Sequence, residues 1–170
     1  MPAVSKLFSS SDGKLQWRAC RIISTVIPQL PAQDRAAINA HITPQLIKML
    51  RNDEIRVKEE ACKAIYKITV ESLIDPKQIR YLVSQGGIKA LCDLLDYKNL
   101  DVIQKALNSL ENIIRVGEAE KDEFCGVNQY ALLVRKAGAM EKIQNLYAEA
   151  CWIRGKVAAI EDSFEASKHK

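Results

Sequence analysis

The sequence predicts an all-α protein, and three observations carry the prediction. Apolar residues recur at the three- and four-residue spacing of one helix face along most of the chain. Glycine is scarce, at 7 of 170 residues, and aromatic residues make up only 6%, whereas β-sandwiches and barrels need many tight turns and large side chains on their pleats. Segments about 45 residues apart also resemble one another, which indicates helical repeats rather than a single bundle.

Length and composition restrict the class of protein further. A chain of 170 residues with 48% hydrophobic and 27% charged residues is typical of one folded domain or one array of repeats. We expect neither a membrane span nor a signal peptide, because no apolar run approaches about 18 residues and the first thirteen residues lack an apolar core. Five widely spaced cysteines predict reduced, mostly buried thiols.

Proline, glycine and short polar side chains mark the helix boundaries. An aspartate before Pro76, with Gln78 three residues after that aspartate, predicts a capping box with proline in the first turn. Pro44 after a threonine predicts a second start of this kind, and the pair Gly86-Gly87 can supply a left-handed residue at a sharp corner. The expected helices span residues 14–27, 32–41, 44–51, 54–70, 76–85, 88–97, 101–116, 128–137, 139–148 and 150–163.

Internal self-similarity sets the organisation of these helices. Residues 46–50 and 57–62 (LIKML and VKEEAC) align with residues 91–95 and 102–107 (LCDLL and VIQKAL) at a constant offset of 45. A period of about 40 to 47 residues with three helices per unit is typical of armadillo and HEAT repeats. The expected fold is therefore a right-handed α-α superhelix, an armadillo-repeat solenoid whose longest helices line a concave groove.

The repeat period divides the chain into segments. An orphan long helix at 14–27 has no unit of its own, so we expect a truncated solenoid with an exposed apolar end, from a fragment or from a complete short gene product. The expected organisation is a disordered tail at 1–13, armadillo repeats over 14–164 with units at about 32–70, 76–116 and 128–163, and a disordered tail at 165–170.

Three strings within these repeats resemble one family. Residues 79–95 (IRYLVSQGGIKALCDLL) are similar to the junction between the eighth and ninth repeats of importin-α. Residues 110–121 (LENIIRVGEAEK) resemble the end of that family's ninth repeat, and residues 137–143 (AGAMEKI) resemble its tenth. The chain is thus similar to the C-terminal armadillo repeats of importin-α, from about the seventh to the tenth.

The resemblance implies a function and a location. Importin-α proteins are adaptors for nuclear protein import that bind basic nuclear localisation signals, so protein partners and residence in cytoplasm and nucleus are expected, with no enzymatic activity and no cofactor. The last two repeats imply contact with a nuclear export receptor. The family's importin-β-binding arm and first six repeats have no counterpart here.

This sequence departs from the family's binding pattern. Importin-α repeats carry a tryptophan and, four residues later, an asparagine on the long inner helix, and spacing of four places both on one face. Those positions hold Arg21 and Thr25 in the first inner helix, and Lys63 and Lys67 in the second. Trp17 lies off this register, as does Trp152. Retained groove positions are Ser24, Glu60, Asn108 and Asn112, while Arg18 replaces an acidic residue.

The inner face of the long helices is expected to be basic. With seven cations and two carboxylates its net charge is +5, against +4 for the whole chain. Such a wall attracts anions and repels basic peptides, and each missing indole forfeits about 0.5 to 2 kcal/mol of cation–π attraction. The minor signal site is therefore expected to be degraded, with basic signals bound weakly if at all. The face comprises Lys14, Arg18, Arg21, Thr25, Arg56, Glu60, Lys63, Lys67, Asp101, Lys105, Asn108 and Asn112.

Other functions remain as alternatives. The chain can be a generic armadillo scaffold, or its basic groove can bind acidic partners or nucleic acid; nucleic acid is disfavoured because the face has no aromatic residue on which bases stack. No membrane partner is expected. Cys125 is remote in sequence from His41 and His169, which argues against a nucleophilic pair. Paired metal-ligand spacings and phosphate-binding glycine motifs are absent from the sequence.

Overall fold

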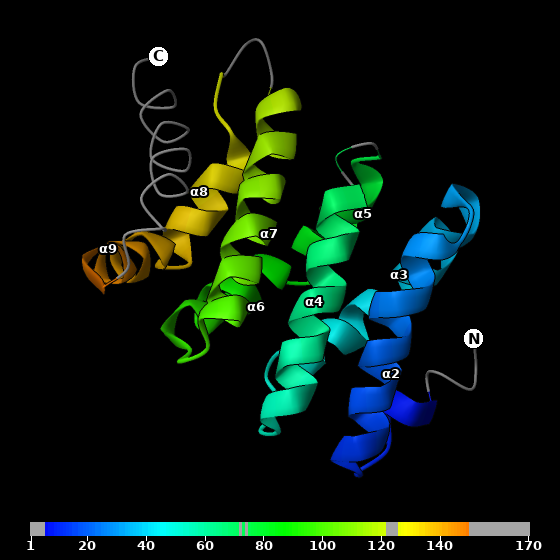
Figure 1. Ribbon diagram of the computed structural model, residues 1–170. Coiled ribbons are helices and arrows are strands. Elements are labelled where there is room, and N and C mark those ends of the chain that lie inside the picture. The colour runs from blue at the N-terminus through cyan, green and yellow to red at the C-terminus, as the bar shows by residue number, and fades with distance from the viewer. Residues whose placement is uncertain (1–5, 72, 74, 122–125, 150–170) are drawn as a thin grey trace. The chain divides into compact units, whose positions relative to one another are not determined.

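The computed structural model describes residues 6–71, 73, 75–121 and 126–149, and these residues form helices and connecting turns without a strand (Figure 1). The chain divides into two compact units, Met1–Ala90 and Leu91–Lys170, and each unit is described by itself. Within the described residues, no helix combines the length and apolarity that crossing a membrane requires.

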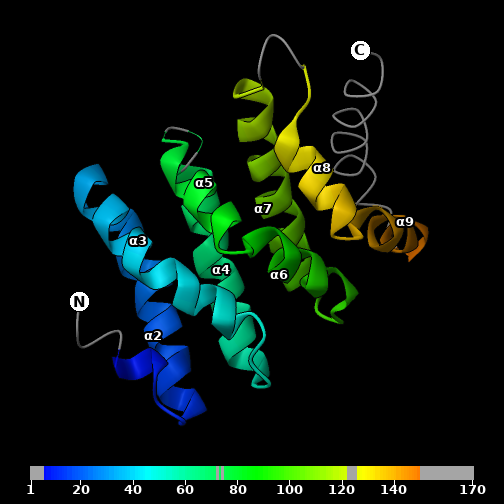
Figure 2. The same cartoon turned by 180° about the vertical axis from the view of Figure 1, so that it is seen from behind.

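The first unit is built around two long helices that lie side by side in both views of the ribbon (Figures 1 and 2). Small residues at the contact, such as Ala19 and Cys20 on one helix and Ala61 on the other, are fully buried and allow a close approach. Ile23 and Ile65 add the larger buried side chains. The helices of this unit are α2 (Gly13–Val26), α3 (Ala32–Met49), α4 (Ile55–Glu71) and α5 (Lys77–Ser84), with a 3-10 turn at Ile27–Gln29.

The prediction of two helices at 32–41 and 44–51 was wrong, because α3 is one continuous helix with Pro44 inside it. Proline removes one helix hydrogen bond and disfavours the helical conformation before it. Ile42, Leu46 and Ile47, on both sides of the proline, are nevertheless buried, and α3 packs on α4. Burial of this shared apolar face outweighs the local cost of the proline.

The segment before α2 differs from the disordered tail expected over residues 1–13. Residues 6–8 are helical, and the Phe8 side chain is 3% exposed. Gln16 of α2 holds this segment by donating its Nε2 proton to the Ser10 carbonyl oxygen at 2.7 Å. The Asp12 carboxylate then caps α2 by accepting the Lys14 N–H at 2.8 Å.

The corner between α5 and the next helix, α6 (Gly87–Asp93), confirms the predicted role of the glycine pair. Gly86 adopts φ +80°, a conformation that side-chain-bearing residues rarely take. Gly87 is buried, and a Cβ atom there would lie 2.7 Å from the Leu82 side chain. The first glycine thus supplies the turn and the second supplies the close approach.

The second unit is centred on one long helix, α7 (Leu100–Ala119), which begins with Asn99 accepting the Asp101 N–H at 2.9 Å. Asparagine immediately before a helix is typical of such a cap. The core side of α7 buries an apolar stripe at helical spacing. That stripe includes Val102, Ala106, Leu107, Leu110, Ile113 and Ile114.

Shorter helices complete the second unit. A 3-10 turn at Leu94–Asp96 precedes α7, and α8 (Gln129–Lys136) and α9 (Ala139–Glu149) follow it. Lys142 of α9 reaches Asp96 at 2.6 Å and the Cys92 carbonyl oxygen at 3.2 Å, which ties α9 to the residues before α7. The helix expected at 150–163, the tail at 165–170, and Cys125, Cys151, Trp152 and His169 lie outside the described residues.

Candidate functional site

The packing of α2 against α4 brings two of the predicted groove residues together. Ser24 of α2 donates its hydroxyl proton to Oε2 of Glu60 on α4 at 3.3 Å, and the Ser24 side chain is buried at 4% exposure. The two positions lie 36 residues apart in sequence, on the facing sides of the two long helices. We call the face of this helix pair that the sequence predicts to line the groove the α2–α4 surface; the cations predicted on it are Lys14, Arg18, Arg21, Arg56, Lys63 and Lys67.

Glu60, the carboxylate in the middle of this surface, is already partnered within the protein. Lys63, one turn along α4, places its Nζ 2.9 Å from Oε1 of Glu60, and the Glu60 side chain is only 14% exposed. Lys67 donates its Nζ proton to the Ser24 carbonyl oxygen. Contacts within the protein therefore already neutralise the Glu60 carboxylate, with which a lysine of a bound peptide would have to pair.

Arg21 and Thr25, which occupy the tryptophan and asparagine positions on α2, also make contacts within their own helix. The Thr25 hydroxyl donates to the Arg21 carbonyl oxygen at 2.7 Å. The guanidinium carbon of Arg21 lies 5.1 Å from the centre of the Trp17 ring, within the range of a cation–π contact. The threonine hydroxyl is thus used locally, and the arginine stacks on an indole of the same helix.

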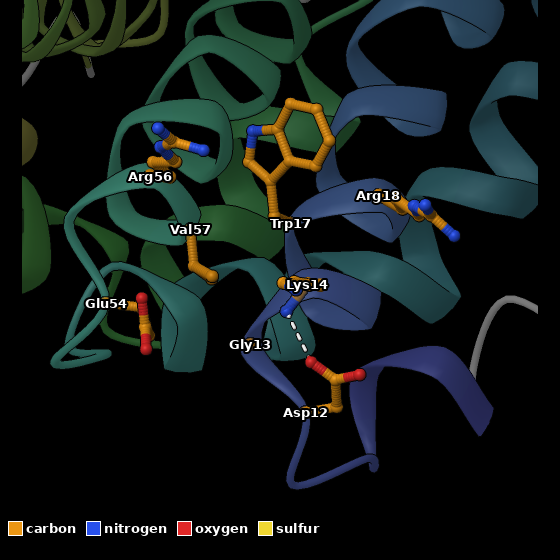
Figure 3. A pocket seen from close by; sticks show the side chains of 8 residues that line it. All are labelled: Asp12, Gly13, Lys14, Trp17, Arg18, Glu54, Arg56 and Val57. Atoms are coloured by element: carbon orange, nitrogen blue, oxygen red, sulfur yellow. Dashed lines mark hydrogen bonds between the residues drawn. The ribbon is translucent and has the colours of Figure 1, made fainter.

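Trp17 lines a pocket of about 430 Å³ between the N-terminal ends of α2 and α4 (Figure 3). The sequence interpretation left this tryptophan out because it lies off the register of the family pattern. Its spacing of four from Arg21 was the available signal, since residues four apart share a helix face. The pocket is lined by Asp12, Gly13, Lys14, Trp17, Arg18, Glu54, Arg56 and Val57.

Charges around this pocket are segregated. In Figure 3, Arg56 of α4 and Arg18 of α2 lie on the two sides of Trp17, whereas Asp12 and Glu54 lie at the other end of the view. Asp12 is the cap of α2. Glu54 immediately precedes α4, and its backbone N–H donates to the side-chain oxygen of a neighbouring asparagine. The carboxylates therefore sit at helix N-termini, where negative charge is stabilising, and Lys14 lies beside Asp12, while the two arginines flank the indole (Figure 3).

The predicted positions on α7 belong to the second unit. Lys105 pairs with Asp101 one turn earlier. Asn112 is 8% exposed, and the amide oxygen of Asn108 is buried without a hydrogen-bond partner among the described residues. The structure therefore brings Ser24, Glu60, Lys63 and Lys67 together on the first unit and describes Asn108 and Asn112 on a separate one.

Cys20 lies beneath the α2–α4 surface. Burial raises the pKa of its thiol to about 12, and the Glu60 carboxylate adds to the increase. Cys20, Cys62 and Cys92 are buried thiols, as expected from their apolar helix positions. Within the described ranges, no group of three or more His, Cys, Asp or Glu side chains is arranged to hold a metal ion.

The raised Cys20 pKa predicts a loss of stability in base. The unfolded chain releases this proton near the ordinary thiol pKa of 9.0 while the folded protein retains it, so the stabilisation is complete below pH 9 and is lost as the pH rises towards 12. We expect the free energy of unfolding to fall by about 1 kcal/mol more in the native protein than in Cys20→Ala between about pH 9 and pH 10. Urea unfolding titrations at both pH values measure this difference. An equal fall in the free energy of unfolding for the two proteins between these pH values would contradict the prediction.

Comparison with known proteins identifies the repeats. The family model "Armadillo/beta-catenin-like repeat" matches residues 31–70 and 75–115. Importin subunit alpha-5 of Arabidopsis thaliana is 35% identical over 128 residues, covering 75% of this chain and 24% of that protein. Importin subunit alpha of Saccharomyces cerevisiae is 51% identical over 71 residues, covering 41% of this chain and 13% of that protein.

Solved structures agree on the fold. A designed armadillo repeat protein superposes with a TM-score of 0.69 at 24% identity, covering 98% of this chain and 62% of that one. Computationally designed armadillo repeat proteins for modular peptide recognition give a TM-score of 0.75 at 22% identity, covering 94% of this chain and 62% of that one. The predicted all-α armadillo solenoid is confirmed.

The importin-α relatives extend well beyond the matched region, because this chain spans about a quarter of their length, 24% for the first two. The match nevertheless covers most of this chain, and the armadillo and importin-α fold is that of a non-enzymatic adaptor and scaffold. The chain is an importin-α-like armadillo-repeat protein.

Proposed function

We propose that this protein serves as an importin-α-like adaptor in protein import into the nucleus, present in cytoplasm and nucleus, and that its minor site for basic localisation signals is degraded. The similarity to importin subunits alpha supports the adaptor role. The armadillo fold supports binding of protein partners in general. The degraded site follows from the side chains of the α2–α4 surface.

One observation supports the proposal that the minor signal site is degraded: Glu60, the acidic residue retained on this surface, already has partners within the protein. It accepts the Ser24 hydroxyl at 3.3 Å and pairs with Lys63 at 2.9 Å. A lysine of an incoming signal would have to displace Lys63, and it would approach the exposed Lys67 while doing so. Like charges brought together at an interface cost up to several kcal/mol, and no aromatic shelf at these positions compensates for that cost.

We expect the native protein to bind a fluorescent basic peptide too weakly to saturate at micromolar concentration. Fluorescence anisotropy with a lysine-rich localisation signal measures this, with the same peptide carrying alanine for lysine as the control. Saturable micromolar binding to the lysine peptide, lost in a Glu60→Gln variant, would contradict the degraded site.

The runner-up function is a generic armadillo scaffold without a transport role. Its support is that the strings most similar to importin-α contain packing residues: Ile79, Leu82, Leu91 and Leu95 are all buried. A pull-down separates the two functions. Under the transport proposal, a nuclear export receptor is retained through the last two repeats; under the scaffold reading, it is not.

A further inference from the structure

We propose that the pocket around Trp17 binds an aromatic side chain of an acidic peptide segment, with the flanking carboxylates of that segment paired to the cations of the α2–α4 surface. The inference builds on the protein-binding role proposed above and names the ligand of this surface. It rests on the shape of the pocket, its indole wall and the distribution of charge around it.

The pocket has the size and lining for a planar apolar group. Its volume of about 430 Å³ falls within the usual range of about 300–1,000 Å³ for ligand sites. Trp17 is half-buried in the wall, and Val57 is 1% exposed beside it. Arg21 stacks on the indole, which fixes the orientation of the ring. A phenylalanine or tyrosine side chain can pack against it in an offset or edge-to-face arrangement.

Charge complementarity selects an acidic rather than a basic segment. Arg18 and Arg56 lie on the two sides of the indole, whereas Lys14 lies next to Asp12 (Figure 3). Arg21 and Lys67 continue the positive charge along the same two helices, where Glu60 and Lys63 form an ion pair. A ligand with carboxylates on one side of its aromatic residue meets these cations, whereas a basic ligand is repelled by them.

The two carboxylates of the pocket favour a peptide over a nucleic acid. Asp12 and Glu54 occupy one end of the pocket, and a polynucleotide carries a phosphate at every residue, so it cannot avoid them. A peptide can place an uncharged residue there. Among the described residues that line this pocket, Trp17 is also the one aromatic residue, whereas non-specific single-strand binding uses successive stacking platforms.

The test is a peptide titration of the full chain by fluorescence anisotropy. The probe is a labelled peptide with one phenylalanine between a run of glutamate and a run of serine, and its partner peptide carries alanine instead of the phenylalanine. We expect about tenfold tighter binding of the phenylalanine peptide. Trp17→Ala should remove that difference without further weakening the alanine peptide, which is the signature of a direct contact between the two rings.

Charge variants keep the proposal testable if Trp17→Ala does not fold. Arg56 is exposed, so Arg56→Gln retains the fold, and we expect it to weaken the acidic peptide about threefold and to reduce the salt dependence. Lys48→Gln, an exposed cation of α3 outside the pocket, serves as the matched control and should leave binding unchanged.

Three outcomes would overturn the inference: equal affinity for the phenylalanine and alanine peptides, binding unaffected by Arg56→Gln, or tighter binding of oligothymidylate than of the acidic peptide. A basic-peptide arm keeps this test separate from the proposed function. Saturable binding of the basic peptide contradicts the proposal that the signal site is degraded. If only the acidic peptide fails to bind as expected, the proposed pocket alone is contradicted.

Discussion

Gly117→Ala is expected to lower the free energy of unfolding by about 3 kcal/mol, although alanine normally stabilises a helix interior by about 1 kcal/mol relative to glycine. Gly117 lies buried in α7, where α8 crosses it. A Cβ atom at this position would lie 2.3 Å from the Asn128 amide oxygen and 2.9 Å from a ring carbon of Tyr130. Both distances are shorter than van der Waals contact, so the helices must separate.

Separation of α7 from α8 also breaks the hydrogen bonds of Asn128, a fully buried side chain. Its amide oxygen caps α8 by accepting the N–H groups of Tyr130 at 3.1 Å and Ala131 at 3.0 Å. Its amide nitrogen donates to the Ile114 carbonyl oxygen of α7 at 2.8 Å. Loss of a helix cap costs about 1 kcal/mol, and an unsatisfied buried polar group adds about 1–3 kcal/mol.

Gly13→Ala is the matched control for this substitution. A Cβ atom at Gly13 would meet Cγ of Glu54 at 2.9 Å, but Glu54 is exposed and its flexible side chain can move away. We expect a change within about 0.5 kcal/mol. Urea unfolding followed by circular dichroism compares the two variants. A neutral or stabilising effect of Gly117→Ala would show that α7 and α8 are not in close contact at this position.

The sequence predicted the long helices because their apolar residues follow a regular period and their ends carry local caps. The cap that Asn99 forms on α7 and the left-handed conformation of Gly86 both depend on residues close together in the chain. The residue types alone therefore indicate them. The resemblance to importin-α also implied that Ser24 and Glu60 lie in one groove, and their hydroxyl and carboxylate lie 3.3 Å apart.

Features that depend on contacts between elements were missed. Pro44 reads as a helix start, and only burial against α4 shows that α3 continues through it. Trp17 was set aside because it does not follow the family register, yet the close packing of α2 and α4 places it in a pocket wall. Adding formal charges also counted Glu60 and Lys63 as separate, whereas their atoms lie 2.9 Å apart.

Restoring the family residues should create binding of a basic signal. The variant combines Arg21→Trp and Lys63→Trp with Thr25→Asn and Lys67→Asn. Arg21, Thr25 and Lys67 are exposed, and the Lys63 side chain is 39% exposed, so the new side chains project from the surface without overpacking the core. We expect a gain of at least about a thousandfold in affinity for the lysine-rich peptide over the native protein.

The gain has two physical sources that a second variant separates. Removing Arg21, Lys63 and Lys67 eliminates three like charges and frees Glu60 from the 2.9 Å pair with Lys63. Each indole then adds about 0.5 to 2 kcal/mol of cation–π attraction, and each amide adds about 1 kcal/mol of hydrogen bonding to the peptide backbone. Alanine at the same four positions supplies only the first source, and we expect about a tenfold gain. If anisotropy shows the same affinity for the alanine and the restored variants, the missing indole and amide side chains are not what weakens the site. Charge repulsion alone then accounts for the weak binding.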